Sequence, residues 1–154
     1  VGLDYMKDTE NIEKQKKAFE KFIELAKELD KPIIVHSRKA ETDCIEMLEK
    51  AKAEKVVMHC FSGKISLAKR IEKNGWFLSI PANVKNSEHF QTVVKEISIN
   101  NLLCETDSPF LHPDKLENNE PCNVIESYKK IAEIKNLKIE EVEKKIESNY
   151  NKIF

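Results

Sequence analysis

Glycine is scarce in this sequence of 154 residues. Only three glycines are present, and none belongs to a G-x-G-x-x-G pattern. An open doubly wound α/β sheet that binds a dinucleotide usually carries such a phosphate loop after its first strand. The shortage of glycine therefore argues against this class of nucleotide-binding protein.

The sequence also lacks an excess of charge of either sign. It contains 26 Lys and Arg residues against 27 Asp and Glu residues, so the formal net charge is −1. Proteins that bind nucleic acid through their whole surface are strongly basic, because phosphate contacts supply most of the non-specific affinity. Any nucleic-acid partner must therefore be held locally, by a few residues.

Signals for membrane insertion or export are missing as well. No apolar run approaches the roughly 18 to 20 residues that a membrane span needs, and residues 1–5 contain neither a basic region nor a signal-like apolar core. The four cysteines form no C-x-x-C pair, and hydrophobic residues make up 40% of the chain, which is untypical of a disulfide scaffold. We expect a cytoplasmic protein with reduced cysteines and no membrane partner.

What the sequence does contain is an alternation of helical and strand patterns. Apolar residues at helical spacing predict helices in residues 11–29, 44–51, 65–71, 87–97, 124–132 and 139–146. Short apolar runs predict buried parallel strands in residues 33–35, 56–58, 76–80 and 102–104. Strands that alternate with helices indicate consecutive βαβ units, and no linker interrupts residues 1–154, so we expect one α/β domain.

Two parallel architectures fit this alternation, an open doubly wound sheet and a (β/α)8 barrel. The missing glycine-rich loop disfavours the open sheet. A barrel takes about 250 residues, so this chain would supply only four or five of its eight strands. We therefore expect an incomplete barrel.

Polar residues follow three of the predicted strands. His36 and His59 come directly after all-apolar runs, and Asp107 follows a third run. The carboxyl ends of parallel strands form one rim, so these residues are expected to share a cleft. A single histidine at a strand end is usually structural, but core packing does not require this recurrence. Two imidazoles and a carboxylate suit Zn²⁺, Mn²⁺ or Fe²⁺, with Mg²⁺ also possible.

Other polar residues near these strand ends are secondary candidates. The guanidinium of Arg38 could reach a phosphate at the same rim, or it could form a salt bridge with Glu41 or Asp43. Glu105 precedes Asp107 by two positions and would point the same way on a strand, so the two carboxylates could act together. We expect His89 and His112, which lie in a helical segment and in a loop, to be structural or exposed.

Together, the motifs of the sequence resemble the TatD family of metal-dependent deoxyribonucleases. Two of them, His-Cys-Phe-Ser-Gly and Glu-Thr-Asp-Ser-Pro, are strong signatures, and the order and spacing of all of them match the family. The segments that carry the resemblance are Gly2–Tyr5, His36–Ala40, His59–Gly63, Glu105–Leu111, Asn119–Pro121 and Asn149–Phe154.

The resemblance implies a TIM-type (β/α)8 barrel of the amidohydrolase kind, of which residues 1–154 would supply about strands 4/5 to 8. It implies hydrolysis of DNA phosphodiester bonds, with removal of nucleotides from an end, by divalent ions such as Zn²⁺, Mg²⁺ or Mn²⁺, two in a complete site. His36, His59 and Asp107 would be metal ligands, with Asp107 also activating water. The family's remaining ligands, an H-x-H pair and a glutamate, are expected upstream of Val1.

The resemblance also suggests residues that handle the substrate. We expect catalytic roles for Arg38 and Glu105, and substrate binding by Arg38, Ser62 and Lys115. The family usually has an Arg-Gly pair before its Asn-Glu-Pro motif, where this sequence has residues 114–118, and Lys115 could replace that arginine as a point charge.

Two other functions remain open at this point. The same ligand set would serve an amidohydrolase that acts on a small amide or ester. Alternatively, the chain could be a catalytically incomplete fragment, because it holds only part of the expected ligand set. An unclosed barrel would expose two strand edges, so we expect such a fragment to self-associate.

Overall fold

A parallel β-sheet forms the centre of the computed structural model, which describes residues 1–6 and 10–154. Within those residues the sheet has five strands in the order β1-β2-β3-β4-β5, and each strand pairs in parallel with the next. The strands are β1 (Gly2–Asp4), β2 (Ile33–Arg38), β3 (Val56–Met58), β4 (Phe77–Pro81) and β5 (Leu102–Glu105).

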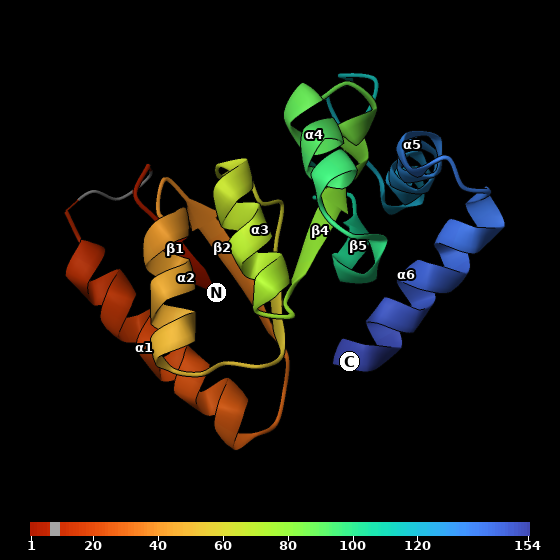
Figure 1. Cartoon of the computed structure of the whole chain (residues 1–154). Helices are drawn as coiled ribbons and strands as arrows, with labels where there is room; N and C mark the ends of the chain where they lie inside the picture. The colour runs from red at the N-terminus through yellow and green to blue at the C-terminus, as the bar shows by residue number, and fades with distance from the viewer. Residues whose placement is uncertain (7–9) are drawn as a thin grey trace.

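Helices connect the strands and pack around the sheet. The α-helices are α1 (Ile12–Glu28), α2 (Glu41–Lys50), α3 (Ile65–Lys73), α4 (Glu88–Glu96), α5 (Ile125–Lys135) and α6 (Ile139–Ile153). Three short 3₁₀ helices are η1 (Ala82–Lys85), η2 (Ile99–Asn101) and η3 (Pro121–Val124). From α2 to α6 each helix contacts the next, and Figure 1 shows the chain passing around the sheet from α1 to α6.

The predicted alternation of helices and strands is confirmed. All four predicted strands and all six predicted helices are present, and their ends differ from the expected ones by up to three residues, except that α6 extends seven residues beyond its predicted end. The structure adds β1, which the sequence analysis did not count among its strands. The strand order follows the chain order, which is the arrangement of consecutive βαβ units.

Gly2 allows β1 to lie against β2. Its φ angle is +135°, and a Cβ atom at this position would stand 1.9 Å from the carbonyl oxygen of His36. Any other residue would therefore push the two strands apart. The register Gly2↔His36 and Asp4↔Arg38 depends on this close approach.

Most of the hydrophobic core lies between the helices and one face of the sheet, while β3 and β4 are buried on both faces. Each strand contributes at least one side chain that is fully buried; these are Leu3, Val35, Met58, Leu78 and Leu102, all with an exposed fraction of 0%. Between β3 and β4 the indole of Trp76 is also buried and donates a hydrogen bond of 2.9 Å to the carbonyl oxygen of Ala53. Burial of these aliphatic side chains supplies the main stabilisation of the fold.

Two details of the predicted burial are wrong. The run Ile33–Val35 was expected to be buried on both faces, but exposure alternates along β2 and the Ile34 side chain is 49% exposed. Ile34 lines a cavity of about 390 Å³ that Tyr150 and Phe154 also border, so its side chain is only partly covered. The apolar pattern of residues 11–29 also predicts burial of Phe22 and Leu29, but Phe22 on α1 and Leu29 directly after it are exposed, because only the stripe through Phe19 and Ile23 faces the sheet.

Neither disulfides nor membrane-spanning helices occur in the described residues. All four cysteines are unpaired. Across residues 1–6 and 10–154, no helix combines the length and the apolar character that crossing a membrane requires.

Replacing a core leucine tests the importance of the central sheet. We expect Leu78→Ala to lower the free energy of unfolding by about 2–5 kcal/mol, because the side chain is fully buried and its removal leaves a cavity. Leu25→Ala, at a 45% exposed position on α1, is the control and should change it by less than about 0.5 kcal/mol. Urea denaturation measures both, and equal effects would contradict this description of the core.

Candidate active site

The carboxyl ends of β2, β3 and β5 bring the three predicted ligands to one place. His36 lies within β2, His59 directly follows β3, and Asp107 lies two residues beyond β5. All three line a single cavity of about 550 Å³, and the two imidazole ring centres are 6.4 Å apart. The predicted cleft is thus present, and residues more than 20 positions apart in sequence meet in it.

Unusual backbone conformations gather at this rim. Lys39, Cys60 and Asp107 have φ angles of +57°, +45° and +57°, in the left-handed region that residues other than glycine seldom adopt. Each of the three follows the end of a different strand. Such conformations persist only where surrounding structure enforces them, and they are common at functional sites.

His59 is held by two carboxylates. Its Nδ1 lies 2.6 Å from Glu105 Oε2, and its Nε2 lies 3.2 Å from Asp107 Oδ1. Ser79 on β4 donates a hydrogen bond of 2.7 Å to the same oxygen of Glu105. The second carboxylate oxygen, Oε1, is buried and has no hydrogen-bond partner among the described residues. Glu105 therefore fixes the orientation of the imidazole, and Ser79 fixes Glu105.

The same contacts set the protonation of His59. The hydrogen bond to the Glu105 carboxylate raises the pKa of His59 above its ordinary value of 6.5, although burial opposes the shift. The negative charges of Glu105 and Asp107 raise this pKa further. These contacts favour the imidazolium form of His59 relative to a histidine in water.

His36 pairs with a residue that ends β1. Its Nε2 lies 3.1 Å from Asp4 Oδ2. Gln15 on α1 holds the backbone of Asp4 from both sides, because its Oε1 accepts from the Asp4 amide at 2.8 Å and its Nε2 donates to the Asp4 carbonyl at 3.2 Å. Asp4, which the sequence analysis did not include among the site residues, thus lines the cavity together with His36.

The structure decides whether Arg38 forms a salt bridge with Glu41 or Asp43 or faces the cavity, where it could reach a phosphate. Asp43 pairs with Lys16 Nζ at 2.6 Å and accepts a hydrogen bond of 2.6 Å from the Tyr5 hydroxyl. Burial and this hydrogen bond raise the pKa of Tyr5 to about 12. Within the described residues, Arg38 forms no salt bridge with Asp43 or with Glu41, and it lines the cavity instead.

The other predicted substrate contacts lie at two neighbouring places. Ser62 is exposed and lines the same cavity as the histidines. Lys115 lines an adjacent cavity of about 320 Å³, and Leu111 borders both cavities. Among the residues that the structure describes, Lys115 forms no ion pair, so its charge is available to a ligand.

The histidines expected to be structural lie outside the principal cavity. His89 Nε2 lies 3.2 Å from the carbonyl oxygen of Phe61, which ties α4 to the turn after β3. His112 accepts a hydrogen bond of 3.0 Å at Nδ1 from the Asp114 amide, within the loop after β5. Neither lines the cavity that contains His36 and His59.

Asn119 is a residue of the site whose importance the sequence analysis missed. It is buried, with an exposed fraction of 4%, and its Nδ2 donates hydrogen bonds of 2.7 Å to the carbonyl oxygens of both Thr106 and Phe110. It thereby fixes the turn that contains Asp107. The signal was the short Asn-Glu-Pro motif, which is weak because three residues carry little information without their structural context.

The donor set fits a divalent cation in its chemistry. Imidazole nitrogens and carboxylate oxygens are the ligands that Zn²⁺ and Mn²⁺ accept, and Glu105 Oε1 is a buried acceptor without a partner. In the described residues, however, no group of three such side chains is already gathered closely enough to hold an ion. The donors are instead paired with one another, His36 with Asp4 and His59 with Glu105 and Asp107.

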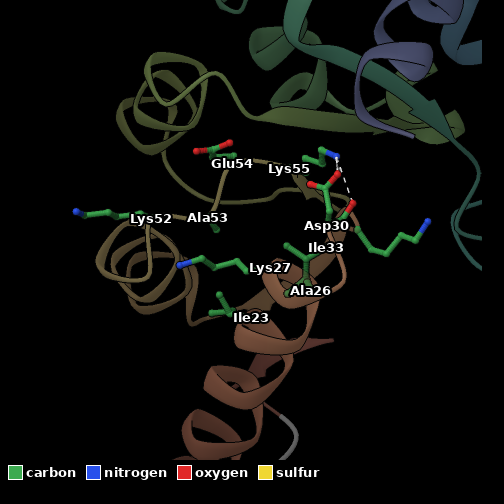
Figure 2. A pocket seen from close by; sticks show the side chains of 10 residues that line it. Ile23, Ala26, Lys27, Asp30, Ile33, Lys52, Ala53, Glu54 and Lys55 are labelled. Atoms are coloured by element: carbon green, nitrogen blue, oxygen red, sulfur yellow. Dashed lines mark hydrogen bonds and ion pairs between the residues drawn. The ribbon is translucent and has the colours of Figure 1, made fainter.

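A further cavity lies at the opposite ends of β2 and β3. It has a volume of about 220 Å³ and is lined by four lysines, three of which, Lys27, Lys52 and Lys55, are labelled in Figure 2. Lys27 donates to the carbonyl oxygen of Ala51, and Lys55 donates to the carbonyl and carboxylate oxygens of Asp30 at 3.2 and 2.7 Å. Two of the four lysines thus satisfy carbonyl groups at helix ends.

Sequence comparison assigns the chain to a family. The profile of the family described as "TatD related DNase" matches residues 1–154. The chain belongs to this family. The resemblance expected from the motifs is therefore confirmed, and the match extends over the whole chain.

Proteins from distant organisms are similar to the chain. It is 42% identical over 154 residues to the uncharacterized metal-dependent hydrolase MJ1582 of Methanocaldococcus jannaschii, covering 100% of this chain and 60% of that protein. It is 38% identical over 158 residues to human deoxyribonuclease TATDN3, covering 100% of this chain and 58% of that protein. The chain thus spans about three-fifths of the length of these relatives.

Solved structures show the same fold. The TatD homologue YJJV from Escherichia coli K12 superposes with a TM-score of 0.93 at 23% identity, covering 100% of this chain and 61% of that one. A TatD family hydrolase from Entamoeba histolytica gives a TM-score of 0.85 at 24% identity, with the same coverage of both chains. The predicted α/β class is therefore confirmed.

The contact between His59 and Glu105 predicts a measurable pKa change. In metal-free protein, Glu105→Gln should lower the pKa of His59, because the hydrogen bond to a charged carboxylate is the main cause of the raised value. The measurement is an NMR titration of the His59 ring, with Glu54→Gln as a control far from it. An unchanged pKa in Glu105→Gln would contradict the pairing.

The same pair should contribute to stability in a defined pH range. The pKa of His59 is raised on folding, so its stabilisation is fully present below about pH 6.5 and is lost as pH rises through the folded-state pKa. Glu105→Gln should therefore destabilise the metal-free protein more below about pH 6.5 than well above it. Thermal unfolding across this range would show the difference.

Proposed function

We propose that the protein is a metal-dependent hydrolase that cleaves phosphodiester bonds of DNA. The observation that carries the proposal is the convergence of His36, His59 and Asp107 on one cavity at the carboxyl ends of β2, β3 and β5. Membership of the TatD-related DNase family supports the choice of substrate. The names of two relatives, a metal-dependent hydrolase and a deoxyribonuclease, support the same chemistry.

In this proposal His36, His59 and Asp107 hold divalent metal, either Zn²⁺, Mg²⁺ or Mn²⁺, with two ions in a complete site. A bound divalent ion lowers the pKa of water from 15.7 to about 7 and so supplies a nucleophile at neutral pH. Metal binding would replace the ion pairs that these side chains now form with one another and with Asp4. Glu105 and Ser79 would keep His59 in the orientation that presents Nε2.

The other residues of the rim handle the substrate. Asp107 accepts the proton of the attacking water, because its carboxylate already faces the cavity beside His59. Arg38, which is free of Glu41 and Asp43, stabilises the negative charge that develops on the phosphate. Ser62, in the cavity of the histidines, and Lys115, in the adjacent cavity, contact the DNA backbone. The enzyme removes nucleotides from an end of the DNA.

We also propose that residues 1–154 form one domain corresponding to about strands 4/5 to 8 of a (β/α)8 barrel. The five parallel strands and the 60% coverage of a longer relative support this assignment. Further ligands would then come from strands outside this chain. A cytoplasmic location is part of the proposal, and the four unpaired cysteines fit a reducing compartment.

Nucleotide release from single-stranded DNA tests the proposed activity. The full-length protein should release nucleotides with Mg²⁺, Mn²⁺ or Zn²⁺ but not with a chelator, and His59→Ala should abolish the release. His89→Gln is the matched control, because His89 lies outside the cavity and glutamine can preserve a hydrogen bond to Phe61. Release should be unchanged in this control.

Failure to release nucleotides with any divalent ion would overturn the proposal. If the same preparation instead hydrolysed a simple ester or amide, and His59→Ala abolished that reaction, the site would belong to a small-molecule amidohydrolase. Activity in the full-length protein but not in residues 1–154 alone would identify this chain as catalytically incomplete.

Self-association through exposed strands is a separate expectation for residues 1–154. In the described residues, β1 and β5 each pair on one side only, and the Ile34 side chain of β2 is 49% exposed. Unpaired strand edges favour pairing with another copy. Light scattering of residues 1–154 should give a mass above that of the 17.9 kDa monomer. Ile34→Lys should reduce this mass, and a monomer at all concentrations would refute the expectation.

A further inference from the structure

Two large apolar side chains are exposed in the segment that joins β5 to η3. Phe110 has an exposed fraction of 68%, and Leu116 has one of 65%. They stand on the same loop as Asp107 and Lys115. Each lines a cavity, Phe110 the one that contains His36 and His59, and Leu116 the adjacent one.

The backbone of Phe110 is fixed although its ring is exposed. Its amide donates a hydrogen bond of 2.8 Å to the carbonyl oxygen of Asp107, and its own carbonyl accepts one of 2.7 Å from Asn119. Asn119 is itself buried, with 4% exposure. The aromatic ring is therefore presented beside the candidate active site from a rigid support, which lowers the entropic cost of binding to it.

The cavities around this loop suit a chain-like ligand. Phe110 lines the 550 Å³ cavity that contains His36 and His59, and Leu111 separates it from the adjacent cavity of about 320 Å³. Pro113 and Leu116 give the second cavity apolar walls, and Lys115 gives it a positive charge. Along the two cavities, an aromatic ring, apolar walls and a positive charge follow one another, and these groups match the alternating bases and phosphates of a nucleic-acid strand.

We propose that Phe110 is a stacking platform for a nucleobase of single-stranded DNA, while Lys115 contacts a neighbouring phosphate. This inference rests on the proposed nuclease function and adds a binding site to it. Every base has a flat π-face, so stacking on Phe110 would hold a strand without selecting its sequence. It would also compensate for the weak bulk attraction expected of a chain with net charge −1.

Binding to two matched oligonucleotides tests the stacking. One is ordinary single-stranded DNA, and the other has the same sugar-phosphate backbone without bases. In the full-length protein, Phe110→Ala should weaken binding of the ordinary strand by about 5- to 150-fold and leave binding of the base-free strand unchanged. Phe110→Tyr, which keeps an aromatic ring, should retain the affinity.

Phe22→Ala is the control, because Phe22 is an exposed phenylalanine on α1 that does not line either cavity. It should bind both strands like the unmodified protein. A second readout is independent of catalysis: the indole introduced by Phe110→Trp should lose fluorescence when ordinary DNA binds and not when the base-free strand binds. The native Trp76 is only 2% exposed and provides a constant background.

The outcomes separate this inference from the proposed function. If the protein cleaves DNA and His59→Ala abolishes cleavage, but Phe110→Ala binds both strands like the unmodified protein, the stacking site is refuted and the nuclease stands. If Phe110→Ala weakens the binding of both strands equally, the residue acts on the fold of the loop, and the inference is also overturned. If the full-length protein neither binds nor cleaves DNA, both proposals fail.

Discussion

The parallel register of neighbouring strands is the constraint on which the rest of the molecule depends. Because β1, β2 and β3 run in the same direction and pair residue by residue, Gly2 lies beside His36, and the amide of His59 donates to the carbonyl oxygen of Val35. This alignment places the carboxyl end of every strand at one edge of the sheet. The alignment of the strands alone brings the polar side chains at those ends together, and no contact between helices is needed for it.

Hydrogen bonds across the sheet then convert this proximity into a defined arrangement. The contact between His59 and Glu105 bridges the ends of β3 and β5, and Ser79 on the intervening strand β4 completes it. On the other side, Gln15 of α1 holds Asp4 against His36. The two histidines are thus oriented by different parts of the fold, one by neighbouring strands and one by a helix.

Much of the fold and part of the site could be predicted from the sequence, for reasons that differ between residues. Helix and strand patterns are local, so α1 and β2 were recognisable from the spacing of their apolar residues. His36 and His59 were recognisable because both follow apolar runs. By contrast, the burial of Asn119 and the exposure of Ile34 depend on what lies across space from them, and no local pattern records that. The environment of such residues can be determined only from the three-dimensional structure.

The anchoring of the loop by Asn119 has a consequence for how this protein can change. Because the backbone around Asp107 is fixed by an amide side chain, the ring of Phe110 is not needed to keep that loop in place. The residue at position 110 can therefore vary in size and polarity while the carboxylate of Asp107 keeps its position. Ligand preference and catalytic geometry are therefore separable in this arrangement. Substitution at position 110, in evolution or by design, could alter ligand preference without disturbing the catalytic geometry.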